Sequence, residues 1–326
     1  MRYPASEKLE IIRLVEGSHL PVNRTLEKLG VSRPTFYRWC DLYQRFGEDG
    51  LEDRRSGPGR VWNRIPDEVR GQLIDLALEQ PELSPRELAV TFTDERAYFV
   101  SEASVYRLLR AHGLITSPAF AVMKAADEFH DKTTAPNQLW QTDFTYLKVT
   151  GWGWFYLSTI LDDFSRYIIA WKLCTTMRAS DVTDTIEMAL EASGLEERSK
   201  AHRPRLLSDN GSSYIAGDLA KWLDDQGIGH VRGAPNHPQT QGKIERWHQT
   251  LKNRILLENY YLPGDLEAQI GDFVSHYNHR RYHESLGNLT PADVYSGRGQ
   301  TILMKREAIK QRTFEQRRLQ HARRAA

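Results

Sequence analysis

Residues 139–173 read LWQTDFTYLKVTGWGWFYLSTILDDFSRYIIAWKL, and this stretch decides which fold we expect. It holds three runs of β-branched and aromatic residues separated by short turns, at 139–149, 154–161 and 167–173. Such runs predict an antiparallel meander of three strands. Helices and strands then alternate, with helices at 179–192, 214–225 and 240–257 and strands at 204–208 and 228–232. We therefore predict an α/β domain with a mixed five-stranded sheet flanked by helices.

Three carboxylates come from three separate elements of this pattern. Asp143 lies in the first strand, Asp209 follows the fourth, and Glu245 lies in the last helix with 35 residues between it and Asp209. Ligands collect at strand ends in α/β sheets, and a neighbouring helix can add one side chain. No lysine or arginine adjoins Asp143 or Asp209 in sequence, so a hard divalent cation, Mg²⁺ or Mn²⁺, is the natural compensation for their repulsion. Two such ions, about 3.5–4 Å apart, would suit an in-line phosphoryl transfer.

Each of these acids also has a structural interpretation. Asp209 begins Asp-Asn-Gly, which is a strong turn sequence by itself. Asp162 and Asp163 end the second strand and could serve in place of Asp143, or could be turn acids. The histidines lack the spacing of zinc ligands, so we expect no zinc site.

The predicted helix 240–257 carries one polar face. Gln241, Glu245, His248 or Gln249, and Lys252 share that face at helical spacing. Glu245 would bind the cation, and the hydrogen-bond donors on and beside this face would contact a DNA backbone. The candidate DNA contacts are Lys243, Arg246, His248, Gln249 and Lys252. A solvated helix with an ordinary mixture of charges is the alternative.

The first part of the chain is typical of a helix-turn-helix. Helical patterns at 6–15 and 21–29 precede LGVSRPTFYRWC at 29–40, where Gly30 can turn the chain and Ser32 can cap the next helix. Phe36 and Trp39 would face the core. The exposed start of this helix would enter a major groove, with contacts from Arg33, Thr35, Tyr37 and Arg38. An ordinary three-helix packing unit remains the alternative.

A second unit of the same kind follows. LSPREL at 83–88 is a capping box with Ser84 as N-cap and Glu87 three residues later, and Ser101 opens another helix. The exposed residues of that helix are Ser104, Arg107 and Arg110. We divide the chain into helix-turn-helix domains at 1–46 and 66–115, linkers at 47–65 and 116–135, a core at 136–297 and a basic tail at 298–326.

Composition sets wider limits. No run of 18 apolar residues and no apolar signal core occur, so we expect neither membrane insertion nor secretion. The two cysteines give no disulfide framework and fit a reducing cytoplasm. Residues 298–326 carry nine Lys/Arg against two Asp/Glu, which suits either contact with a polyanion or a solvated tail.

Five segments together resemble a known family. WQTDFTYL, LDDFSRYI, LLSDNGSSY, HPQTQGKIERWHQTLK and YNHRRYHESLGNLTPADVY, all within residues 140–295, are similar to the integrase-type catalytic core of bacterial insertion-sequence transposases. The tandem helix-turn-helix units fit the same family. The resemblance implies a ribonuclease-H-like core and a DDE triad formed by Asp143, Asp209 and Glu245, which would bind two Mg²⁺ or Mn²⁺ ions.

The resemblance also implies a reaction and its partners. These are cleavage at the terminal inverted repeats of an insertion sequence, strand transfer of the freed 3′-hydroxyl into target DNA, and a homo-oligomer on paired ends at the bacterial nucleoid. The basic tail would contact DNA or another protomer. A transposase-derived DNA-binding regulator without catalysis is the alternative, against which the intact acids argue. A nuclease without joining activity is a third alternative. Two helix-turn-helix units argue against it, because a non-specific nuclease has little need to recognise a DNA sequence.

Overall fold

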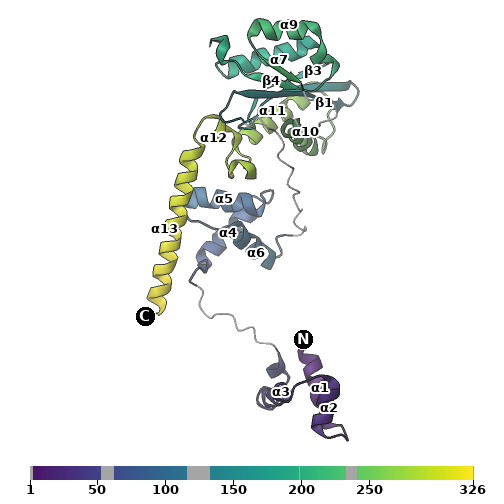
Figure 1. Ribbon diagram of the computed structural model, residues 1–326, viewed down its shortest axis with the longest axis vertical. Coiled ribbons are helices and arrows are strands. Elements are labelled where there is room, and N and C mark those ends of the chain that lie inside the picture. Colours follow the sequence, from purple (N-terminus) through teal and green to yellow (C-terminus); the bar gives the residue numbers. More distant parts are fainter. Residues whose placement is uncertain (1–2, 53–61, 116–132, 198, 233–240, 326) are drawn as a thin grey trace. The chain divides into compact units, whose positions relative to one another are not determined.

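A computed structural model describes residues 3–52, 62–115, 133–197, 199–232 and 241–325 (Figure 1). The chain divides into two compact units, one formed by Met1–Arg64 with Gln320–Ala326 and one by Ile65–Leu319. The predicted second linker falls largely on residues 116–132, outside the described residues.

The first unit consists of three helices and a short 3₁₀ turn: α1 (Ala5–Glu16), α2 (Val22–Leu29), α3 (Arg33–Phe46) and η1 (Gly47–Leu51). The predicted core positions Phe36 and Trp39 are buried, which confirms the face assigned to α3. The Ser32 hydroxyl pairs with the Thr35 hydroxyl at 2.7 Å, so it does not cap the backbone as expected. Leu51 is also buried and its carbonyl accepts from Lys8 Nζ, so the fold of this unit continues into the predicted linker.

The second unit begins with three more helices, α4 (Asp67–Glu79), α5 (Pro85–Arg96) and α6 (Glu102–Ala111). The predicted capping box is confirmed: Ser84 Oγ accepts from the Glu87 amide at 3.3 Å, and Glu87 Oε2 accepts from the Ser84 amide at 3.0 Å. Its core includes Leu73, Phe92 and Val105. The capping box satisfies two backbone donors and so fixes the residue at which α5 begins.

The sheet has five strands, β1 (Leu139–Val149), β2 (Gly153–Asp162), β3 (Ile168–Cys174), β4 (Arg205–Ser208) and β5 (His230–Arg232). Their order is β3-β2-β1-β4-β5. Strands β1 to β3 pair antiparallel, while β1 with β4 and β4 with β5 pair parallel. The predicted meander and mixed sheet are therefore confirmed.

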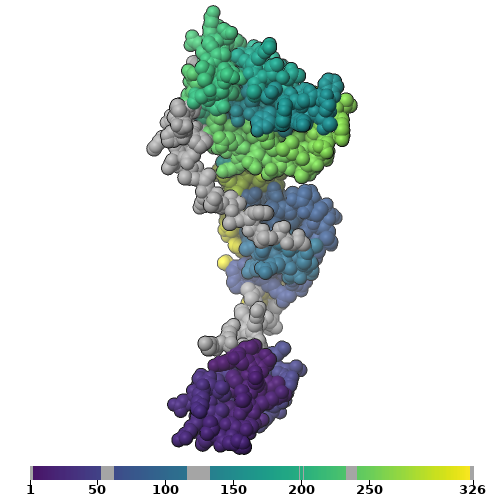
Figure 2. All heavy atoms as spheres, turned by 90° about the vertical axis from the view of Figure 1, so that its right-hand side faces the viewer, coloured from purple at the N-terminus to yellow at the C-terminus, as the bar shows by residue number. Residues whose placement is uncertain are grey.

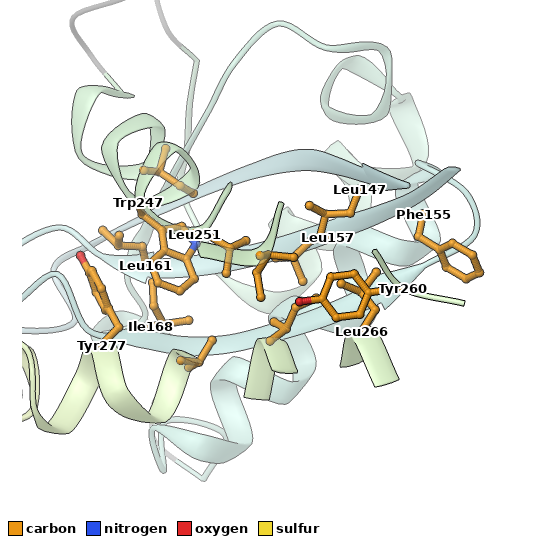
Figure 3. Close-up of a cluster of buried hydrophobic side chains, with 14 of the residues drawn as sticks. Leu147, Phe155, Leu157, Leu161, Ile168, Trp247, Leu251, Tyr260, Leu266 and Tyr277 are labelled. Carbon is orange, nitrogen blue, oxygen red and sulfur yellow. The ribbon is translucent and has the colours of Figure 1, made fainter. Parts of the chain in front are cut away.

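Helices cover both faces of the sheet (Figure 1). One layer contains α7 (Ala179–Ala192), α8 (Ser212–Ile215) and α9 (Gly217–Gln226), and the other contains α10 (Gly242–Ile255) and α11 (Pro263–His279). Successive side chains of a strand face opposite sides, so Trp140 packs in the first layer and Leu147 in the second. Figure 3 shows the second cluster, in which Trp247 and Leu251 of α10 meet the strands. Figure 2 shows the atoms of the same unit packed closely together.

The basic tail forms one long helix, α13 (Gly299–Ala325), which follows η4 (Glu284–Leu286) and α12 (Pro291–Tyr295). One side of α13 contacts α5 and the segment between α5 and α6. Arg306 binds Asp94 through two hydrogen bonds of 2.8 and 2.6 Å, and Arg317 donates to the Phe99 carbonyl at 2.8 Å. This side of the tail is occupied within the chain, so it is not available to DNA or to a second protomer.

His283 makes the stability of this unit depend on pH. It lies 4.9 Å from the Tyr277 ring, and burial, assisted by Arg281 and neighbouring cations, lowers its pKa from 6.5 to about 3. In the unfolded chain, His283 is protonated below about pH 6.5, whereas in the folded chain it stays neutral down to about pH 3. The folded state therefore loses stability relative to the unfolded state as pH falls from about 6.5 to about 3.

We expect the free energy of unfolding to fall as the pH is lowered from 7 to 5.5. His283 contributes at most about 1.4 kcal/mol per pH unit to this slope. His283→Phe should flatten the slope, as measured by urea unfolding at each pH. His321→Phe, at a half-exposed position on α13, is the control. Equal slopes in wild type and His283→Phe would contradict the assignment.

Candidate active site

Asp143 lies on β1, and Asp209 directly follows β4, the parallel neighbour of β1. In the parallel pair of β1 and β4, Trp140 is opposite Leu206 and Gln141 is opposite Leu207. Two further steps along both chains bring Asp143 level with Asp209, which follows the last residue of β4. Neighbouring strands are about 4.8 Å apart, so the two carboxylates occupy one edge of the site.

A buried tyrosine connects these two acids. Tyr214 of α8 is 3% exposed, and its hydroxyl lies 3.4 Å from the Thr142 hydroxyl. Burial raises the pKa of Tyr214 well above its ordinary value, and the negative charges of Asp143 and Asp209 raise it further. Both carboxylates therefore act on the same phenol, which stays protonated and neutral beneath them.

Helix α10 brings Glu245 toward the same site. His248 is buried and its Nδ1 lies 3.4 Å from Asp143 Oδ2, while Glu245, three residues earlier on α10, is exposed. Across the described residues, no three Asp, Glu, His or Cys side chains are grouped closely enough to hold a metal ion. The structure thus brings together Asp143, Asp209 and the helix that carries Glu245, but it does not gather the three acids into a closed cluster.

The start of α10 is fixed by contacts that the sequence did not reveal. Gln141 Oε1 accepts from the Ile244 amide at 3.1 Å, and Gln141 Nε2 donates to Asp163 Oδ1 at 2.8 Å. Lys243 Nζ lies 2.8 Å from both the carbonyl and Oδ1 of Asp163. Lys243 thus holds α10 to the sheet through Asp163, and its expected contact with DNA stays a prediction.

Asp162 also has a structural role. It is completely buried and accepts hydrogen bonds from the Asn137 amide at 2.7 Å and from the Ser165 amide and hydroxyl at 2.8 and 2.6 Å. Burial raises its pKa despite these bonds. It closes the turn between β2 and β3, so neither rival of Asp143 lies free in the site. Periodicity and spacing did not separate the three acids, because the partners of Asp143 and Asp163 on α10 are distant in the chain.

The other expected DNA contacts on α10 divide into two groups. Arg246 and Gln249 are exposed, and Lys252 Nζ lies 4.2 Å from the centre of the Tyr146 ring. His248 is only 7% exposed and lies against Asp143, so its contact within the chain is with a candidate catalytic acid, and its expected contact with DNA stays a prediction. Because one side of α10 packs on the sheet, only the side chains on its other side remain exposed to solvent.

The expected contacts of the first helix-turn-helix are mostly accessible. Arg33, Tyr37 and Arg38 are exposed on α3, and Thr35 is half-buried with its hydroxyl on Ser32. Three side chains on one face of α3 thus remain available.

In the second unit, Arg110 is exposed and two candidates have local partners. Ser104 Oγ pairs with the Ser101 hydroxyl at 2.9 Å. Arg107 donates to the Ala103 carbonyl at 3.1 Å and remains exposed. Both partners lie on the same turn of α6, so these side chains stay at its surface.

The described helices include none that is long and apolar enough to span a bilayer. Comparison with known families matches residues 133–238 and 226–291 to integrase core domains. Residues 35–109 match a homeodomain-like domain, and residues 7–59 match a helix-turn-helix domain. Helix-turn-helix domains of this kind bind DNA.

Several solved structures are similar in shape to part of the chain. The catalytic core domain of HTLV-2 integrase in complex with magnesium is 19% identical, with a TM-score of 0.41, and the match covers 50% of this chain and 99% of that one. The catalytic core domain of BIV integrase is 25% identical, with a TM-score of 0.37, over 51% and 97% of the two chains.

Two relatives extend the similarity beyond the core. The transposase for insertion sequence element IS629 of Shigella sonnei is 27% identical over 207 residues, which are 60% of this chain and 68% of the relative. Transposase InsF for insertion sequence IS3A of Escherichia coli strain K12 is 26% identical over 265 residues, which are 80% and 83% of the two chains. The chain therefore joins helix-turn-helix DNA-binding domains to an integrase core, and its similarity to insertion-sequence transposases over most of its length indicates an enzyme of the DDE polynucleotidyl transferase type.

Proposed function

We propose that this protein binds the terminal inverted repeats of an insertion sequence, cuts the DNA at those ends, and joins the freed 3′-hydroxyl to target DNA in the bacterial cytoplasm. Asp143, Asp209 and Glu245 are the catalytic residues of this proposal. The observation that supports it is the position of Asp143 on β1 beside Asp209, which follows the neighbouring parallel strand β4, together with the contact of His248 with Asp143 on α10, the helix that carries Glu245.

The donor set supports a divalent cation here. Integrase cores generally use divalent metal ions. In the described part of the chain, no lysine or arginine forms an ion pair with Asp143, Asp209 or Glu245. Uncompensated carboxylates are the hard oxygen ligands that Mg²⁺ and Mn²⁺ prefer, so these residues fit such ions in kind. When bound, a pair of ions would stabilise the charge on the attacking and leaving oxygens of phosphoryl transfer.

The chain's own residues then orient these ligands. Asp143 Oδ1 accepts from the Phe144 amide and Asp209 Oδ1 accepts from the Gly211 amide, each at 2.8 Å. One oxygen of each carboxylate is therefore fixed by the backbone, which holds the other oxygen in a defined direction. Tyr214 is buried, with its hydroxyl at Thr142 and its ring against Phe144, so it packs around the segment of β1 that carries Asp143.

The division of labour follows the order of the chain. The two helix-turn-helix units, near residues 1–51 and 66–115, would choose the DNA, and the core after residue 135 would cut and join it. Because each cut end must meet the other and the target, we infer a homo-oligomer assembled on paired ends.

The test is to incubate the purified full chain with Mg²⁺ and a labelled duplex that carries the terminal repeats flanking its gene. Cleaved ends and joined products are expected, and they should be abolished by a chelator. Asp218→Asn alters an exposed acid of α9 and should leave the products unchanged. Absence of cleaved and joined products with the wild-type chain would overturn the proposal and leave a DNA-binding regulator.

Sequence reading by the first unit gives a separate prediction. Arg38→Ala removes an exposed guanidinium from the face of α3 that would enter the major groove, and should weaken binding to the terminal repeats about tenfold. The measurement is fluorescence anisotropy on terminal and scrambled duplexes. Arg45→Ala, on the same helix but paired with Asp41 at 2.9 Å, is the matched control. If the wild type bound the terminal and the scrambled duplex with equal affinity, the first helix-turn-helix unit would not recognise the sequence of the terminal repeats.

A further inference from the structure

An aromatic surface lies beside the candidate active site. Tyr146 of β1 and Trp154 of β2 place their rings 5.5 Å apart and nearly perpendicular, and both side chains are more than half exposed, at 58% and 54%. Lys252 of α10 places its ammonium 4.2 Å from the centre of the Tyr146 ring. Lys148, also exposed, is directly opposite Trp154 in the sheet. We call Tyr146, Trp154, Lys252 and Lys148 the aromatic platform.

We propose that the aromatic platform is a binding site for an unpaired DNA base close to the phosphate that is cut. The proposal rests on the proposed function for its choice of DNA as the ligand. Every nucleobase has a flat face that stacks on an aromatic ring, and a lysine beside the ring attracts the adjoining phosphate. A base inside a duplex is covered on both faces, so the platform selects a base that has left its partner.

The position of the platform relative to the catalytic acids supports this ligand. Tyr146 follows Asp143 by three residues on β1, about 10 Å along the strand, and the two side chains leave opposite faces of the sheet, so Lys252 of α10 is what connects the Tyr146 ring to the side of the acids. Lys252 follows Glu245 by seven residues on α10, about 10 Å along a helix and on the same side. DNA advances by about 3.4 Å per nucleotide along one strand, so the platform reaches a base within about three nucleotides of the cut.

The chemistry of the platform favours nucleic acid over a second protein. Exposed aromatic rings also occur at protein interfaces, but lysines are depleted from the cores of such interfaces. Here one lysine lies over a ring and another is paired with the second ring across the sheet. The exposure of both rings also means that their mutual contact contributes little to folding. Aromatic rings alternating with cations are instead the pattern of single-strand binding surfaces.

The test uses a single-stranded DNA 12-mer of mixed sequence with one 2-aminopurine, whose fluorescence falls when the base stacks. The full chain is titrated in the presence of a chelator, so binding is measured without cleavage. Tyr146→Ala and Trp154→Ala should each weaken binding about 5- to 100-fold and reduce the quenching, because each removes one stacking face. Phenylalanine at either position should restore both.

Two further variants make the result specific. Trp152→Ala is the matched control, because Trp152 is equally exposed at 63% and only two residues from Trp154, but lies outside the ring pair. It should bind as the wild type does. Lys252→Ala should lower the dependence of affinity on salt by about 0.7 in logarithmic slope, as expected for the loss of one contact with single-stranded DNA.

Three outcomes overturn the proposal. They are no binding of the 12-mer by the wild type, equal losses for Trp152→Ala and Trp154→Ala, or a change in oligomeric mass by light scattering with unchanged DNA affinity. The last outcome would assign the surface to contact between copies of the chain. Failure of the proposed function is distinguishable, because it appears as absent cleavage with Mg²⁺, whereas binding to the platform is read without metal and also in Glu245→Gln.

Discussion

Replacing Glu245 with glutamine is expected to reduce DNA cleavage and joining on the order of a thousandfold while leaving binding to the terminal repeats unchanged. Glutamine keeps the size of the side chain but removes the negative charge that would hold a divalent cation. Glu245 is exposed on α10, and the buried side of that helix is formed by other residues, so the fold should not change.

Gel analysis of cleaved and joined strands measures the chemistry, and anisotropy on the same duplex measures binding. Glu267→Gln, at an exposed position on α11, is the control and should behave as the wild type. The double variant Asp143→Asn with Glu245→Gln should be no worse than either single variant, because the acids act as one unit. Activity of Glu245→Gln within tenfold of the wild type would exclude Glu245 from the catalytic set.

Replacing Arg306 with alanine is expected to lower the stability of the second unit by about 2–3 kcal/mol. Arg306 makes two bonds to Asp94 and one of 2.7 Å to the Asn288 carbonyl, and its side chain is only 15% exposed. Its loss leaves the Asp94 carboxylate, itself 30% exposed, with only a 3.5 Å contact from Tyr282. The partial exposure of Asp94 keeps the cost below that of a fully buried pair.

Urea unfolding of Arg306→Ala, Asp94→Ala and the double variant forms a cycle that isolates the interaction. The double variant should cost less than the sum of the two single variants. Arg298→Ala removes another arginine paired with an aspartate, but one that is 62% exposed, and should cost less than about 0.5 kcal/mol. Additive losses in the cycle would show that the ion pair does not hold α13 to α5.

Much of the fold follows from local signals in the sequence. The helix expected at 179–192 agrees with α7, and the strand runs agree with β1 to β5 within one or two residues. The helix expected at 214–225 is instead two helices, α8 and α9, because Ala216 between them has extended backbone angles. Periodicity detects apolar faces but not a single residue that breaks a helix.

Local signals in the sequence say less about the candidate active site. Asp143 is one of three similar acids near the ends of strands, and only their partners separate them: Asp162 closes a turn, Asp163 binds Gln141 and Lys243, and Asp143 faces His248. The partners on α10, Lys243 and His248, lie 80 or more residues away in sequence from the acids that they contact. The sequence treats such residues as equivalent, because a carboxylate's role depends on what surrounds it.

The sequence by itself determined the strands, the capping box at Ser84, the buried face of α3 and the family, because each rests on neighbours a few residues apart or on motifs in order. The tertiary structure alone decided that Lys243 anchors α10, that His248 lies inside the site, and that α13 packs on α5. In each of these cases a charged or polar side chain could equally well face solvent, and only long-range packing brings it the partner that compensates its charge.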